Sequence, residues 1–148
     1  MEAAQIQAAL EGMWASFNKK DLDGFVGNLA ENATVWDNTG LSLNSRAEFR
    51  SYVSGLFNFS TDSKVTIPRT IISGDHAAAE LHMEATHDGE PIYGAQPSGK
   101  RVEITWTIHV DIVNGKVQHL RIFSDAGSFL AQLGVGTGLP EAWHNPGG

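Results

Sequence analysis

The chain has 148 residues, of which 41% are hydrophobic and 18% charged, a balance typical of one globular domain. Ten scattered basic residues against 17 acidic ones give a net charge of −7, which argues against nucleic acid as a partner. The absence of cysteine excludes disulfides, thiolate nucleophiles and cysteine-bound metals. No secretory signal and no stretch of roughly 20 apolar residues is visible, so we expect a soluble, cytoplasmic protein without a membrane partner.

Three helices are expected in the first 60 residues. Apolar residues at a spacing of three and four predict the first helix, over residues 3–20. Asp21 is a suitable N-cap for a short second helix over residues 22–29. After a short strand at residues 34–36, the run Ser-Arg-Ala-Glu at residues 45–48 is a capping box that opens a third helix.

Long strands are expected after residue 60. Runs at residues 63–72 and 76–86 are separated by a Gly-Asp turn, and the Gly- and Pro-containing segment 87–99 is expected to be a loop. Apolar and polar residues alternate along residues 100–113, and the following Asn-Gly pair predicts a hairpin into a strand at residues 116–124. Helices followed by antiparallel strands predict an α+β fold, in which a curled sheet closed by N-terminal helices forms a cone with a ligand pocket.

Residues 1–134 are therefore expected to form a single domain. Its last element is a short amphipathic segment over residues 128–133. Residues 135–148 are rich in glycine and proline and are expected to form a flexible tail.

Several short motifs, in order, resemble a known family. Residues 18–24 (Asn-Lys-Lys-Asp-Leu-Asp-Gly) and 32–37 (Asn-Ala-Thr-Val-Trp-Asp) resemble the opening of the nuclear transport factor 2-like fold, which includes the ketosteroid isomerases. The second half resembles the SnoaL-like polyketide cyclase branch through the runs Thr-His-Asp-Gly (86–89), Gly-Ala-Gln-Pro-Ser-Gly-Lys-Arg-Val (94–102) and Asn-Gly-Lys-Val (114–117). Asp125 then stands seven residues before Gln-Leu-Gly. The resemblance covers roughly residues 5–134.

The resemblance implies a cofactor-free enzyme that moves protons on a small hydrophobic carbonyl substrate of the polyketide type. In the cyclases, a carboxylate near the end of the last strand removes a proton α to a carbonyl, and the enolate closes a ring by aldol addition with help from an imidazole. In the isomerases, a carboxylate after the first short strand shuttles the proton, while a tyrosine and a protonated carboxylic acid hold the enolate oxygen.

Three residues are the catalytic candidates that the resemblance implies. Asp125 stands at the cyclase carboxylate, Asp37 at the isomerase base, and His109 near the oxyanion donor, where an imidazole donates to an oxyanion or relays a proton. Each has a structural alternative, since Asp125 suits a helix N-cap, Asp37 a turn and His109 a half-exposed strand position. A register slip of one residue would turn His109 to the other face of the sheet.

Further candidates are expected around the substrate. Aromatic residues, more often part of a core, are expected to supply part of the pocket wall: Trp14, Trp36, Phe57 and Trp106. His87 is expected at the mouth of the cone, and Arg121 is expected to pair with a carboxylate or with an anionic substrate. Met13 stands at or beside the position of the isomerase tyrosine, and its thioether cannot donate a hydrogen bond, which argues against a close steroid isomerase.

No metal and no cofactor is expected. The six histidines show neither a His-x-x-x-His nor a His-Glu-x-x-His pattern, and His82 and Glu84 alternate on a strand without a third ligand nearby in the sequence. No Gly-rich phosphate loop follows a strand, and no Gly-x-Ser-x-Gly elbow is present.

Three functions remain open. The first is a SnoaL-like cyclase or isomerase with Asp125 as base, His109 as relay or enolate stabiliser and Asp37 as second acid–base group. The second is a hydrolase, dehydratase or hydroxylase on the same cone, with an Asp–Arg–Asp site if Asp37, Arg121 and Asp125 all point inward. The third is a non-catalytic small-molecule-binding or dimerisation domain, whose interface the apolar stripe at residues 106–112 would suit if it faces outward. A homodimer or higher homo-oligomer is expected.

Overall fold

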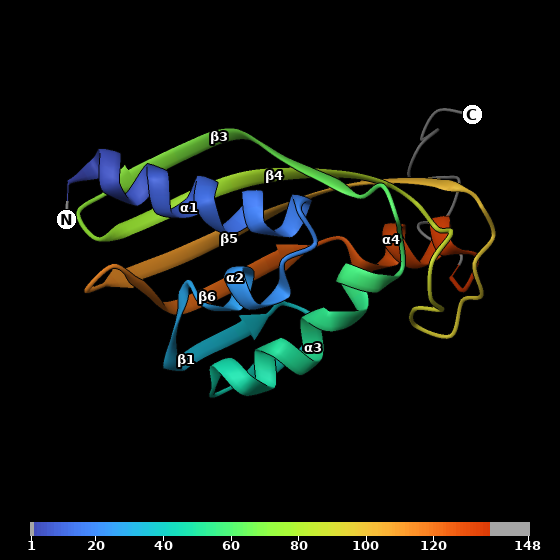
Figure 1. The fold of residues 1–148 in the computed structure, drawn as a ribbon, viewed down its shortest axis with the longest axis horizontal. Helices are drawn as coiled ribbons and strands as arrows, with labels where there is room; N and C mark the ends of the chain where they lie inside the picture. Colours follow the sequence, from blue (N-terminus) through green and yellow to red (C-terminus); the bar gives the residue numbers. More distant parts are fainter. Residues whose placement is uncertain (1, 137–148) are drawn as a thin grey trace, which may run out of the picture.

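A computed structural model describes residues 2–136, which fold into a curved six-stranded sheet and four helices (Figure 1). The helices are α1 (Ala3–Asn18), α2 (Leu22–Val26), α3 (Arg46–Asn58) and α4 (Ala126–Leu133). The strands are β1 (Leu29–Asp37), β2 (Ser42–Leu43), β3 (Lys64–Ser73), β4 (His76–Thr86), β5 (Arg101–Val113) and β6 (Lys116–Ser124). The α+β class and the cone-type architecture are thus confirmed. All but the first two residues of the expected tail lie outside the described residues.

Local sequence explains where the helices begin. The Gly24 N–H donates to the Asp21 carboxylate at 2.9 Å, which caps α2. The Glu48 N–H donates to the Ser45 hydroxyl at 3.1 Å, as the predicted capping box requires. In the second half of the box, the Glu48 carboxylate accepts a hydrogen bond from the Asn44 N–H at 2.8 Å, one residue before the expected Ser45 N–H. None of the helices in residues 2–136 has the length and apolarity needed to cross a membrane.

The strands follow the order β2-β1-β6-β5-β4-β3. All neighbouring strands are antiparallel except β1 and β6, which run parallel. At the hairpin between β5 and β6, Asn114 and Gly115 have φ angles of 52° and 78°, as a type I′ turn requires. The parallel pair joins segments far apart in the chain and has no local signal in the sequence.

The two faces of the sheet differ in what covers them. Buried aliphatic residues alternate with more exposed polar ones along β5. Figure 1 shows α1, α2 and α3 on one side of the sheet, and the buried residues of β5 face them. The apolar stripe at residues 106–112 therefore faces the core, because its Ile108, Val110 and Ile112 are each 1% exposed. The outward-facing interface considered for this stripe is excluded.

Aromatic rings form a cluster between the helices and the sheet. The ring of Phe25 is fully buried and lies 5.0–6.0 Å from four other rings, those of Trp14, Phe17, Phe49 and Phe57. Such aromatic pairs contribute about 0.5–1.5 kcal/mol each beyond the area that they bury. Phe57, expected on the pocket wall, instead belongs to this core, because its ring packs 4.8 Å from that of Phe17.

Asp62, two residues before β3, interacts with the end of β4 and the start of β5. Its carboxylate accepts hydrogen bonds from the Thr86 N–H at 2.8 Å and from the Thr86 and Ser60 hydroxyls at 2.9 Å. The Arg101 guanidinium lies 2.9 Å away. The bond from the Thr86 N–H is the largest cause that lowers the pKa of Asp62 to about 2, and the two hydroxyls and Arg101 lower it further.

We expect the Asp62→Asn variant to lose less stability at low pH than the wild type does. The folded pKa of about 2 lies below the value of about 3.9 for an unfolded Asp, so the carboxylate stabilises the fold above about pH 4. This contribution is lost as the pH falls through 2, and it amounts to about 1 kcal/mol because solvent screens a half-exposed side chain. Urea unfolding at about pH 7 and about pH 3 should show a smaller difference for the variant than for the wild type. An identical difference would contradict the prediction.

Candidate functional site

A cavity of about 280 Å³ lies between the inner face of the sheet and the helices. Its volume is at the small end of the roughly 300–1,000 Å³ that is usual for small-molecule sites. The wall is mostly apolar and is built from all four helices, from β4, β5 and β6, and from Thr39 and Tyr93 in loops. Of the predicted substrate-binding residues, Trp14 and Trp106 lie on this wall, with their rings edge-on at 5.6 Å.

Asp125 lies on the cavity wall, where β6 ends and α4 begins. The Ser128 N–H donates to Asp125 Oδ1 at 3.0 Å, so this carboxylate is also the N-cap of α4. The structural and the functional interpretation of Asp125 are therefore compatible, because an ionised carboxylate offers about four acceptor positions and the cap uses one. The cap bond also orients the carboxylate at the cavity.

Asp37 ends β1 and is 3% exposed. Its Oδ1 accepts a hydrogen bond from the Thr39 N–H at 2.8 Å, as a turn residue would. Thr39 and Tyr52 line the cavity, whereas Asp37 lies behind its wall. Interaction with Asp37 is one cause that raises the pKa of Tyr52, so this buried carboxylate lies close to a residue of the cavity wall.

Two tyrosines for which the sequence suggested no role line the cavity. Tyr52 comes from α3 and Tyr93 from the loop between β4 and β5. Burial raises the pKa of the Tyr52 hydroxyl above its ordinary value, and the neighbouring Tyr93 and Asp37 raise it further. Partial burial also raises the pKa of Tyr93, although about half of this residue remains exposed. Both hydroxyls are therefore protonated at neutral pH, and that of Tyr93 can donate a hydrogen bond to a ligand in the cavity.

A tight turn places Tyr93 at the cavity. Ile92 and Ala95 exchange two backbone hydrogen bonds of 3.1 and 2.8 Å, with Tyr93 at φ 51° and Gly94 at φ 81° between them. A left-handed φ is uncommon for an aromatic residue, and such backbone strain costs of order 1–3 kcal/mol. The Tyr93 ring lies edge-on to Phe129 of α4 at 6.1 Å, which helps to hold it at the cavity.

We expect Tyr52 to ionise well above the ordinary tyrosine pKa of about 10. A raised pKa means that the folded protein keeps the proton where the unfolded chain has lost it, so this residue lowers stability as the pH rises above about 10. Tyrosinate absorbance, followed in the wild type and in Tyr52→Phe, should assign the later ionisation step to Tyr52. A Tyr52 step at the ordinary pKa would contradict the partial burial of its hydroxyl beside Asp37 and Tyr93.

Three predicted site residues lie on the opposite face of the sheet. His109 alternates with buried aliphatic residues of β5 and points away from the cavity, with its Nδ1 3.0 Å from His76 Nε2. The Arg121 guanidinium lies over the Trp36 ring at 4.8 Å on this same outer face. The predicted positions of His109, Arg121 and Trp36 at the pocket are therefore wrong, because the strand register turns them outward. An Asp37–Arg121–Asp125 site is not formed.

His87 is also placed differently from the prediction. It is fully buried, with its Nε2 3.2 Å from the Glu90 carbonyl oxygen and its ring 5.8 Å from that of Phe59. Its backbone bonds to Lys100 and Gly99, both at 2.9 Å, extend the pairing of β4 with β5 by one step. His87 thus continues the inward-facing positions of β4 and does not lie at the mouth of the cone.

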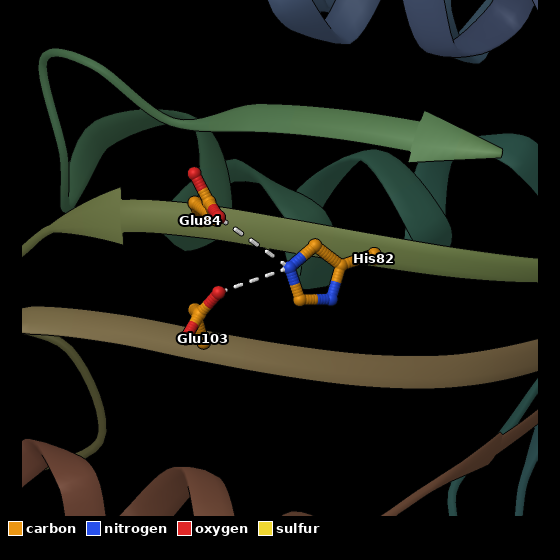
Figure 2. Close-up of side chains that lie close together, drawn as sticks. All are labelled: His82, Glu84 and Glu103. Carbon is orange, nitrogen blue, oxygen red and sulfur yellow. Dashed lines mark hydrogen bonds and ion pairs between the residues drawn. The ribbon is translucent and has the colours of Figure 1, made fainter. Parts of the chain in front are cut away.

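Ligand atoms suited to a metal gather away from the cavity. In residues 2–136, one group brings a histidine and two carboxylates within 4.8 Å of one another, and its members are His82, Glu84 and Glu103 (Figure 2). They extend from β4 and β5 on the outer face of the sheet. His82 and Glu84 form an i, i+2 pair in the sequence, but Glu103 joins them only through strand pairing.

The curved sheet, the covering helices and the cavity between them define the nuclear transport factor 2-like class of fold. The sequence matches the model of the SnoaL-like domain family over residues 10–120. The chain therefore belongs to the SnoaL-like domain family.

Solved structures show the same fold. AclR of Streptomyces galilaeus, described as a candidate hydroxylase, has a TM-score of 0.85 and 21% identity, with coverage of 98% of this chain and 90% of its own. A candidate SnoaL-like polyketide cyclase of Jannaschia sp. CCS1 has a TM-score of 0.76 and 16% identity over 93% and 94% of the two chains. IdmH, a candidate polyketide cyclase of Streptomyces antibioticus, has a TM-score of 0.71 and 23% identity over 87% and 98%. A comparison with curated proteins found no match.

Proposed function

We propose that this protein is a cofactor-independent acid–base enzyme of the SnoaL-like cyclase type, acting on a hydrophobic, polyketide-like carbonyl substrate. The observation that carries the proposal is the carboxylate of Asp125 on the wall of a cavity that is otherwise mostly apolar. The mostly apolar wall suits a hydrophobic ligand, and Asp125 is a solvent-exposed residue on that wall. The family and the candidate cyclases among the similar structures support the substrate class.

In this proposal, Asp125 takes a proton from the carbon next to a carbonyl group of the substrate. The electron pair of the broken C–H bond forms the enolate, and the hydroxyl of Tyr93 donates a hydrogen bond to its oxygen. The enolate carbon attacks a second carbonyl of the same chain and closes the ring, and the resulting alkoxide takes the proton back from Asp125. Asp37 acts as the acceptor that orients Tyr52, in place of the direct acid–base role first expected for it.

Hydroxylation is the second candidate, favoured by the likeness to AclR over nearly the whole chain. Hydroxylation would use the same proton abstraction by Asp125, but it also needs dioxygen and a two-electron reductant to convert the second oxygen atom to water, whereas ring closure needs neither. Labelled dioxygen distinguishes them, because only hydroxylation incorporates its label into the product.

Exchange of the α-hydrogens of 1-tetralone in deuterated water tests the proposed proton abstraction. This ketone is small, bicyclic and apolar, and nuclear magnetic resonance follows the loss of its α-proton signal. We expect the protein to accelerate exchange above the buffer rate, and tryptophan fluorescence to report saturable binding. Saturable binding with exchange at the buffer rate would overturn the proposal and favour a non-catalytic binding domain.

We also propose a homodimer or higher homo-oligomer built on the outer face of the sheet. On the β1–β6 side of this face, Trp36 is 37% exposed next to Arg121, and large exposed apolar residues are typical of interaction surfaces. Light scattering of the wild type and of Trp36→Glu tests this, with a monomer expected for the variant.

A further inference from the structure

We propose that His82, Glu84 and Glu103 bind a divalent transition-metal cation of the zinc type on the outer face of the sheet. Figure 2 shows the imidazole of His82 directed toward both carboxylates. His82 Nε2 lies 3.2 Å from Glu103 Oε1 and 3.7 Å from Glu84 Oε1. Zinc bonds of about 2.0–2.2 Å place neighbouring ligand atoms of one ion roughly 3–3.5 Å apart, so small side-chain movements suffice for all three to bind.

The pairing of β4 with β5 makes a cation favourable at this position. Glu84 and Glu103 are directly opposite each other in the two strands. Like charges in opposite positions destabilise a sheet, and a divalent ion between them removes this repulsion. The pair is therefore an unfavourable choice of residues for the sheet alone, but a suitable one for a bound cation.

Neighbouring side chains hold two of the ligands in position. Thr105 Oγ1 lies 3.0 Å from His82 Nδ1 and holds the ring so that Nε2 faces the carboxylates. Arg101 Nη2 donates to Glu84 Oε2 at 3.1 Å, while the other oxygen of Glu84 faces His82. Such partners outside the first ring of ligands orient the groups that bind a metal.

Charge and access agree with a cation site. Arg101 is shared between Glu84 and Asp62, so its single positive charge does not neutralise the carboxylates around it. The side chains of His82, Glu84 and Glu103 are 32%, 47% and 59% exposed, which leaves room for water to complete the coordination. In the absence of a cation, a protonated His82 between the two carboxylates is the competing arrangement.

The site lies directly behind the wall of the cavity. Met83 and Ile104, the sequence neighbours of the three ligands, line the cavity on the other face of the sheet. The Glu103 N–H donates to the Gln132 side chain of α4 at 2.7 Å, and Gln132 donates to the Glu103 carbonyl oxygen at 2.8 Å. A bound ion would therefore stabilise the end of the sheet on which α4 docks.

Zinc titration of the full chain, purified without a histidine tag, tests the proposal. Competition with a chromophoric chelator should give one equivalent of bound zinc, and His82→Gln and Glu103→Gln should each weaken binding at least tenfold. Thr105→Val should weaken it about tenfold, since loss of a supporting partner costs 10–100-fold in affinity. Cobalt absorption should show the same pattern, and circular dichroism should verify that each variant is folded.

His76→Gln is the matched control. His76 lies on the same strand and face but contacts Asp111 at 2.9 Å and His109 at 3.0 Å, so its loss should leave zinc affinity unchanged. Failure to bind one equivalent, or equal affinity in the wild type, His82→Gln and Glu103→Gln, would overturn the proposal and favour the protonated His82. A loss in His76→Gln alone would place the ion at the other histidine pair and overturn it as well.

Discussion

Asp125→Asn is expected to slow α-hydrogen exchange of 1-tetralone by about 10²–10⁴-fold, because an amide cannot accept the proton. The same variant should keep its melting temperature within a few degrees. Asparagine and aspartate are equivalent helix N-caps, so the amide oxygen still accepts the hydrogen bond from the Ser128 N–H. Thermal unfolding and the exchange rate together separate the base from the cap.

Asp125→Ala and two variants of Asp21 complete this comparison. Asp125→Ala removes base and cap together and should lose about 0.5–2 kcal/mol of stability in addition to the exchange rate. Asp21 caps α2 with the same chemistry but does not line the cavity. Asp21→Ala should therefore lose stability and keep its exchange rate, whereas Asp21→Asn should keep both. Full exchange activity in Asp125→Asn would remove Asp125 from the mechanism.

Phe25→Ala is expected to have the largest effect on stability, a loss of about 3–5 kcal/mol in the free energy of unfolding. The side chain is fully buried and borders the cavity, so its removal enlarges that cavity beside four other aromatic rings. Those rings belong to α1 and α3 and are closely packed, so they relax only in part and the lost contacts are not replaced. The midpoint of urea unfolding measures the effect.

Ile71→Ala is the control for this prediction. Ile71 is a β3 residue that is 64% exposed, and its truncation should change stability by less than about 0.5 kcal/mol. A Phe25→Ala variant with a cost as small as that of Ile71→Ala would show that the aromatic cluster is not the stabilising core.

Elements with a strong local signal could be predicted from the sequence. The Asn114-Gly115 turn, the caps at Asp21 and Ser45, and the alternation along β5 depend on residues a few positions apart, and the structure has each of them. β2 and the parallel pairing of β1 with β6 have no such signal, because a two-residue strand and a distant partner leave no periodic pattern.

For the candidate site, the sequence by itself determined which chemical groups exist. It contains Asp125 between the last strand and the last helix, and it has no cysteine. The family motifs pointed to this carboxylate, and the structure places it on the cavity wall.

Only the tertiary structure decided which groups meet. His109 and Arg121 face away from the cavity because helices cover one side of the sheet, and alternation alone does not tell which side is covered. Tyr93 reaches the cavity through a turn with an uncommon φ, and Glu103 reaches His82 through the pairing of two strands. The apolar cavity at Asp125 and the ligand group at His82 both arise from contacts between residues distant in the chain, which no short sequence pattern encodes.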